Sequence, residues 1–207
     1  MALNICEELF SWLENEAKRQ IEGCKKPAFD GTMLYTPDGK GHYNALWARD
    51  FSYMVENVAD MIPPNEIESA IKYLFRGQRG DGAMPDRVQI DGLPVYCPGG
   101  VSTPLGDPPN PATDNPQFMV KLTMDYVKLS GKSNFFREFE CQLVRGLDFI
   151  TLGEEGLVYI DPNKPHSPYG FTDCVAKTGS LFYSSLLYWE ACKEMAELCG
   201  LAEGKDE

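Results

Sequence analysis

Charged and aromatic residues stand side by side in four short segments, and these are the places where the chain could do chemistry. The segments are LWARD (residues 46–50), RGDGAMPDR (79–87), TDNPQF (113–118) and YGFTDC (169–174). Carboxylates and an arginine in fixed positions bind hydroxyl groups in bidentate fashion, while aromatic rings cover the C–H face of a sugar. The combination favours carbohydrate binding.

Nine charged, amide and aromatic residues of these segments are the candidate binding residues: Trp47, Arg49, Asp50, Asp81, Asp86, Asp114, Asn115, Tyr169 and Phe171. Asp50 follows Trp47 by three residues and precedes Met54 by four, so the three side chains share one face of a helix. Ion pairing alone would be a poor reason to bury this carboxylate, because desolvation can cancel the Coulombic gain. A polar ligand that docks there is a second reason.

Structural roles would also explain several of these residues. Asp50 would pair with an arginine, and Asp81 and Asp86 would form turns beside glycine and proline. Asp114 would cap a helix, with Gln117 completing a capping box. Both readings stay open for each of these residues at the level of sequence.

Six segments carry apolar residues at helical spacing, and they must position the site: about 3–22, 44–61, 65–77, 116–129, 134–151 and 179–199. The turns MIPPNE and SGKSN join the second to the third and the fourth to the fifth as helical hairpins. Among the residues expected to face the core are Leu3, Cys6, Phe10 and Leu13 of the first helix and Cys192 of the sixth.

Two long segments, about 80–112 and 153–178, separate the hairpins and are rich in glycine and proline. VQIDGLPVY (88–96) predicts a small β-hairpin that turns at Asp91-Gly92. Aromatic residues in both segments favour binding loops over disorder. Short turns at one end and long loops at the other indicate a single all-α domain over 1–207, an α/α toroid with a pit at the long-loop end.

Composition excludes several classes of protein. The 207 residues carry a net charge of −12, so a nucleic-acid partner is not expected. No run of about 18 apolar residues predicts a membrane span, and the start lacks the basic and apolar regions of a signal peptide. Seven cysteines without a CxxC pair predict reduced, mostly buried thiols and a cytoplasmic protein. With two histidines as well, we expect no metal site.

The four segments, in this order, resemble the N-terminal half of the six-hairpin glycosidases, which are (α/α)6-barrel glycoside hydrolases. LWARD resembles a motif of glucoamylases, and TDNPQF an element of debranching glucosidases and trehalase-like enzymes. GFTDCVAKTGSLFYSSLLYWEACKEMAELCG resembles a segment of debranching glucosidases, rhamnosidases and sugar phosphorylases. The resemblance extends diffusely over about residues 30–203. Phe171 stands where these families often have tryptophan.

The resemblance implies that Arg49 and Asp50 grip a terminal sugar and that Asp173 is the general acid. It implies hydrolysis of an oligosaccharide or small glycoside, with inversion and without a cofactor. In inverting enzymes the acid and the base that activates water lie about 6.5–9.5 Å apart. No residue stands out as this base, since no motif supports Glu154 or Glu155.

A full barrel of this family has twelve helices, and this sequence predicts six. We therefore expect an incomplete toroid, either a truncated product or a naturally short relative, whose exposed half-barrel faces pair with a second copy. A non-catalytic sugar-binding or interaction protein that lacks the base is the main alternative to a hydrolase. A terpene-type cyclase is a weaker one, because the chain lacks an aspartate-rich metal motif.

Overall fold

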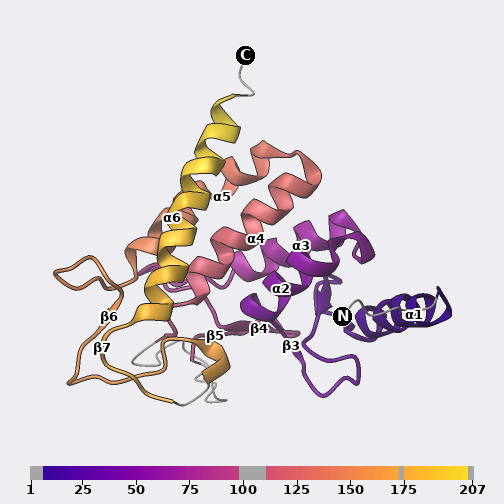
Figure 1. Ribbon diagram of the computed structural model, residues 1–207, viewed down its shortest axis with the longest axis horizontal. Helices are drawn as coiled ribbons and strands as arrows, with labels where there is room; N and C mark the ends of the chain where they lie inside the picture. Colours follow the sequence, from indigo (N-terminus) through magenta and orange to yellow (C-terminus); the bar gives the residue numbers. More distant parts are fainter. Residues whose placement is uncertain (1–6, 98–110, 173–174, 205–207) are drawn as a thin grey trace.

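The computed structural model describes residues 7–97, 111–172 and 175–204. Helices dominate this part of the chain (Figure 1), as the apolar spacing predicts. The helices are α1 (Glu7–Gly23), α2 (Ala48–Val58), α3 (Pro64–Phe75), α4 (Asn115–Ser130), α5 (Ser133–Asp148) and α6 (Phe182–Glu203), with short 3-10 turns η1 (Ala59–Met61) and η2 (Gly170–Thr172). The mostly α-helical class is therefore confirmed.

Small antiparallel sheets lie between the helices. Their strands are β1 (Lys25–Pro27) with β2 (Met33–Tyr35), then β3 (Ala45–Trp47), β4 (Arg87–Gln89) and β5 (Pro94–Val95), and finally β6 (Tyr159–Ile160) with β7 (Gly179–Ser180). The hairpin of β4 and β5 confirms the predicted one, and Gly92 supplies the left-handed residue of its turn at φ +89°. The helix expected from residue 44 begins only at Ala48, because residues 45–47 pair with β4.

Helix α4 is the centre of the structure and packs against α2, α3, α5 and α6. The first turns of α2, α4 and α6 lie at the same end of the molecule. Arg49 at the start of α2 reaches Asn115 at the start of α4, and Gln117 donates to the main-chain oxygen of Ser184 in α6, both over 3.2 Å. Strands β3–β7 and their connections gather at this end (Figure 1), as the loop lengths predict.

The hydrophobic core fills the space around α4 and continues to the small strands. Its largest fully buried side chains include Phe51 of α2, Leu74 of α3, Phe118 of α4 and Phe136 of α5. Since α4 contributes buried residues along almost its whole length, from Asn115 to Val127, it fixes the positions of the helices that surround it.

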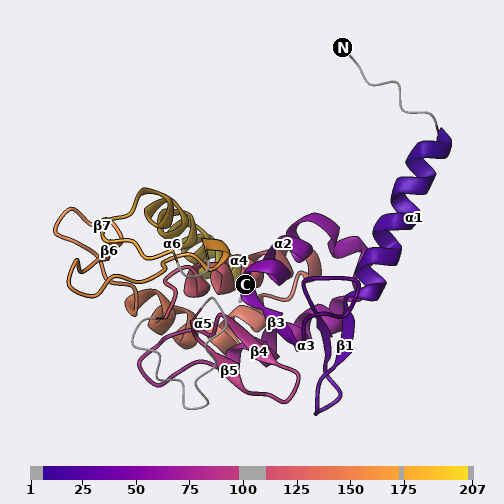
Figure 2. The same ribbon diagram turned by 90° about the horizontal axis from the view of Figure 1, so that it is seen from below.

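Helix α1 corrects one prediction. It has no buried residue, and Figure 2 shows it extending away from the rest of the chain. Phe10 is 63% exposed and Leu13 is 47% exposed, so neither faces the core; Leu3 and Cys6 lie outside the described residues. An apolar stripe shows which face of a helix would be buried. It does not show whether another element covers that face.

Helix α6 corrects another. Its buried residues are Ser184, Ala191, Leu198 and Ala202, and Cys192 is exposed. Apolar residues occur on every side of this helix, so periodicity alone could not select the buried face. Of the five cysteines that the structure describes, only Cys24 is buried, which contradicts mostly buried thiols. Within the described ranges, no helix is both long and apolar enough to cross a membrane.

Candidate functional site

Four of the predicted site residues meet in a buried polar cluster, which we call the arginine hub: Arg49, Asp86, Asp114 and Asn115. Nη1 of Arg49 donates to Oδ1 of Asp86 over 2.5 Å and to Oδ1 of Asn115 over 3.2 Å. Oδ2 of Asp114 lies 3.7 Å from the same nitrogen. The Arg49 side chain is only 3% exposed and both carboxylates are fully buried.

Local structure brings these residues together. Asp86 immediately precedes β4, and its carbonyl accepts a hydrogen bond from the N–H of Ala48, the first residue of α2. This bond sets the first turn of α2, including Arg49, against Asp86. Oδ2 of Asp86 also accepts a hydrogen bond from Nη1 of Arg87 over 2.8 Å. Two arginines therefore share this carboxylate.

The loop of residues 167–172 is attached to the hub. Oδ2 of Asp114 accepts a hydrogen bond from the N–H of Gly170 over 3.0 Å, and the Thr113 hydroxyl donates to the carbonyl of Pro168 over 3.1 Å. The guanidinium of Arg49 lies 5.1 Å from the centre of the Phe171 ring. A Cβ atom at position 170 would overlap that guanidinium, so any larger residue there requires Arg49 or the loop to move. The predicted acid Asp173, which follows this loop in the sequence, lies outside the described residues.

Asp50 lies beside the hub and differs from its two buried carboxylates. It is half-buried, and its carboxylate makes no hydrogen bond or ion pair with another residue in the part of the chain that the structure describes. Burial raises the pKa of Asp50 to about 6; Arg49 opposes this rise, and the nearby Asp86 adds to it. Asp50 is therefore a carboxylate in contact with solvent that can bind a hydroxyl group near neutral pH.

Aromatic side chains line the site on one side, including the two that the sequence predicts. Phe171 is half exposed and stacks on Tyr53 with ring centres 6.2 Å apart. Tyr169 stacks on Phe118 at 6.5 Å and meets Tyr183 edge-on at 5.0 Å. The sequence analysis missed the three partners. Helical spacing could have found two of them, since Tyr53 follows Asp50 by three residues and Phe118 follows Asp114 by four.

Trp47 and Asp81 stand outside the hub's hydrogen bonds. The Arg87 guanidinium lies 5.3 Å from the centre of the Trp47 ring, so Trp47 contacts the hub's neighbour. Asp81 is exposed, pairs with Arg79 over 2.7 Å and accepts a hydrogen bond from the N–H of Ala83. This is the turn-forming role considered for Asp81 as the alternative to binding.

Asp114 does not cap α4, because its side chain makes no capping hydrogen bond. Instead its carboxylate joins Arg49 to Gly170. Burial raises the pKa of Asp114 to about 7, although the charge of Arg49 lowers it. The capping-box interpretation is therefore wrong, and Asp114 links two segments of the site.

Several buried polar atoms at and around the hub have no hydrogen-bond partner among the described residues: Nε of Arg49, Oγ of Ser52, Oδ1 of Asp114 and Oε1 of Gln117. Each such atom costs about 1–3 kcal/mol of folding free energy. Native proteins carry few such groups, and each calls for an explanation, of which a functional role is one. No group of three or more His, Cys, Asp or Glu in the described ranges could hold a metal ion.

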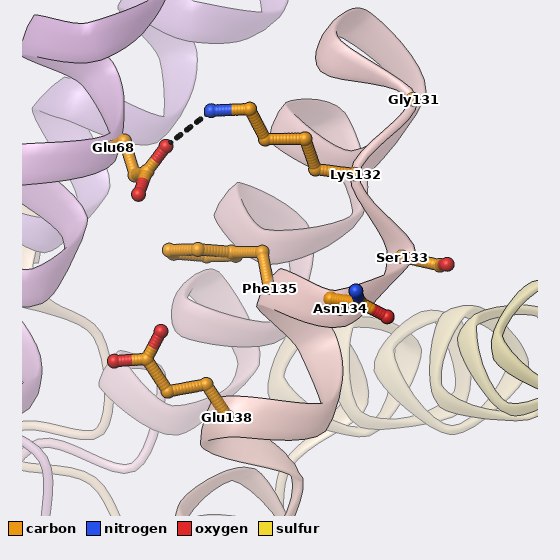
Figure 3. A pocket seen from close by; sticks show the side chains of 7 residues that line it. All are labelled: Glu68, Gly131, Lys132, Ser133, Asn134, Phe135 and Glu138. Atoms are coloured by element: carbon orange, nitrogen blue, oxygen red, sulfur yellow. Dashed lines mark hydrogen bonds and ion pairs between the residues drawn. The ribbon is translucent and has the colours of Figure 1, made fainter.

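A hollow of about 540 Å³ lies away from the hub. It is lined by Glu68 of α3 and by residues from the turn between α4 and α5 and the start of α5 (Figure 3). Its charges are mutually paired: Lys132 contacts Glu68 over 2.8 Å, and Lys72 contacts both Glu68 and Glu138. The 16 residues of α4 separate this turn from the hub by about 24 Å. The hub end remains the better candidate, because its polar atoms are not all paired.

Comparison of the chain with models of known protein families, with curated proteins and with solved structures found no match. The site itself is therefore the basis for a functional assignment.

Proposed function

We propose that the chain is a carbohydrate-active protein, a glycoside hydrolase that acts on a terminal sugar. Its helices would form the N-terminal half of an (α/α)6 toroid, with the pit at the end where α2, α4 and α6 begin. One observation carries the proposal. Residues from four separate segments, each selected from the sequence as sugar-binding, meet at that end around Arg49.

The geometry divides the proposed roles. Asp50 contacts solvent and would accept hydrogen bonds from sugar hydroxyls. Arg49 is buried and committed to Asp86 and Asn115, so it would act by fixing the site rather than by gripping the sugar. The half-exposed ring of Phe171 would cover the C–H face of the sugar.

In the proposed reaction the carboxyl of Asp173 donates its proton to the glycosidic oxygen as the bond to the anomeric carbon breaks. A water molecule attacks that carbon from the opposite face and loses its proton to a second carboxylate. The loop of residues 167–172 precedes Asp173 in the sequence, and its Gly170 and Pro168 are hydrogen-bonded to Asp114 and Thr113, the two residues before α4.

Sugar binding without hydrolysis is the second candidate, and one observation favours it. Asp86 and Asp114 are fully buried against Arg49, which leaves Asp50 as the described hub-side carboxylate open to solvent. An inverting reaction needs two carboxylates that reach the substrate. Glu154 and Glu155 are exposed in a turn of the 153–178 segment, and no contact connects them to the hub in the described ranges.

Hydrolysis is tested with p-nitrophenyl glycosides of glucose, galactose, mannose and rhamnose in both anomeric forms, together with maltotriose and cellotriose. We expect the wild type to release sugar from at least one of them. The Asp173→Asn variant should be slower by about 10²–10⁴-fold. Asp161→Asn is the matched control, because Asp161 is an exposed aspartate of the same segment, and it should retain wild-type activity.

Three outcomes are distinct. Turnover that is lost only in Asp173→Asn supports a hydrolase. Binding of a trisaccharide by calorimetry without turnover by the wild type selects the sugar-binding protein. Neither binding nor turnover with any of these compounds contradicts both candidates.

A further inference from the structure

A groove of about 390 Å³ crosses α2, α4 and α6 next to the arginine hub. Four aromatic side chains line it: Tyr53, Phe118, Tyr183 and Trp189. Tyr53 and Phe118 each stand about one helical turn beyond a residue of the site, Asp50 and Asp114 respectively. The groove therefore begins one turn further along the helices than the proposed site of the terminal sugar.

Ring contacts make the groove continuous with that site. Tyr53 in the groove stacks on Phe171 with an angle of 14° between the rings. Tyr183 of α6 meets Tyr169 edge-on, and Phe118 of α4 stacks on the same Tyr169 ring. Phe171, which also contacts Arg49, thus connects the hub to the groove, and Tyr169 packs between Phe171 and the groove.

Charged groups accompany the aromatic rings. Glu56, Lys121 and Glu190 line the same groove, and Nζ of Lys121 contacts Glu56 over 3.1 Å. Trp189 is 60% exposed. Nζ of Lys193 lies 4.4 Å from the centre of this ring and covers one of its faces. The other indole face, beside carboxylates and the Lys121 ammonium, offers an apolar surface and hydrogen-bonding partners for hydroxyl groups.

We infer that this groove is a second sugar subsite, which binds the unit that adjoins the terminal sugar, and that the substrate is an oligosaccharide. The inference rests on the proposed function. The volume of the groove falls within the range of about 300–1,000 Å³ that is typical of small-molecule sites. Glu56 is already paired with Lys121, but a purely apolar occupant would displace water from Glu190 without supplying a hydrogen-bond donor, whereas a sugar supplies donors through its hydroxyl groups.

The test uses Trp189→Ala, with Trp12→Ala as the matched control, because Trp12 is 58% exposed and belongs to α1, far along the chain from the groove. Steady-state kinetics are measured with maltotriose, cellotriose and the p-nitrophenyl monoglycosides. We expect Trp189→Ala to raise KM by about tenfold for whichever trisaccharide is hydrolysed. Its inhibition constant for the released monosaccharide, which fills the terminal site alone, should stay within about twofold of the wild type.

An unchanged KM for the trisaccharide in Trp189→Ala would overturn the subsite and leave the proposed hydrolase intact.

Analytical sedimentation of the wild type and both variants tests whether a second copy of the chain occupies the groove instead. A wild-type dimer that Trp189→Ala converts to monomers would show that a second copy covers the groove, which would also overturn the subsite. If the wild type hydrolyses none of the compounds, trisaccharide binding is measured by calorimetry. Loss of trisaccharide binding in Trp189→Ala but not in Trp12→Ala supports a subsite that acts without catalysis. If the wild type binds neither trisaccharide, the subsite is overturned.

Discussion

Replacing Gly170 by alanine tests the packing at the centre of the site. The added Cβ would overlap the guanidinium of Arg49, a side chain that is 3% exposed and hydrogen-bonded to Asp86 and Asn115. Arg49 cannot move without breaking these bonds. If the loop of residues 167–172 moves instead, the hydrogen bond from Gly170 to Asp114 is lost.

The magnitude follows from these two routes. Overpacking a buried site costs about 1–3 kcal/mol, and losing a hydrogen bond to a charged group costs about 1.5–3 kcal/mol. We therefore expect Gly170→Ala to lower the free energy of unfolding by about 2–3 kcal/mol. For a chain of this size that corresponds to a fall in Tm of roughly 4–12 °C.

The assay is urea unfolding followed by circular dichroism, with Gly80→Ala as the control. Gly80 is an exposed loop glycine with open space where a Cβ would be added, so its substitution should change stability by less than about 0.5 kcal/mol. Tryptic cleavage after Lys177, just beyond the loop, reports whether the loop is the part that moves. Equal stability of Gly170→Ala and Gly80→Ala would refute the contact between Gly170 and Arg49.

Three further predictions concern stability. Because the pKa of Asp114 is raised to about 7, the folded state binds more protons than the unfolded state below that pH, so stability should fall as the pH rises from about 4 to 7. Asp114→Asn should weaken this pH dependence, which is measured as the free energy of urea unfolding from pH 5 to 8. An unaltered slope of that free energy against pH contradicts the prediction. Asp86→Asn leaves Arg49 buried with less compensating charge and should destabilise the fold by about 3–5 kcal/mol in urea unfolding; a loss below about 0.5 kcal/mol argues against the hub. Leu13→Asp on exposed α1 should shift Tm little, whereas Leu74→Ala in the core should cost about 2–5 kcal/mol; equal losses would mean that α1 is covered.

The sequence predicts the helices well because each is long enough to show its apolar period. The strand at residues 45–47 was missed, since three residues are too few for a period and they run directly into the apolar pattern of α2. The hairpin at Asp91-Gly92 was found because an Asp-Gly pair is a strong local signal.

The site could be predicted in its membership better than in its arrangement. The motifs select Arg49, Asp86 and Asp114 as candidates for one site, but their burial depends on contacts between residues 37 or more positions apart. No local pattern records such contacts. Asp114 shows the consequence: its local sequence fits a helix cap, while its actual partner, Gly170, lies 56 positions away.

Sugar binding at the hub end of the helices is the central claim, and titration calorimetry of the wild type and Asp50→Asn with maltotriose and cellotriose tests it most directly. We expect the wild type to bind at least one of the two trisaccharides, and Asp50→Asn to bind it at least about tenfold more weakly, since a carboxylate accepts stronger hydrogen bonds from hydroxyl groups than an amide does. Equal affinity in the two proteins, or no heat of binding from the wild type with either sugar, would contradict the claim.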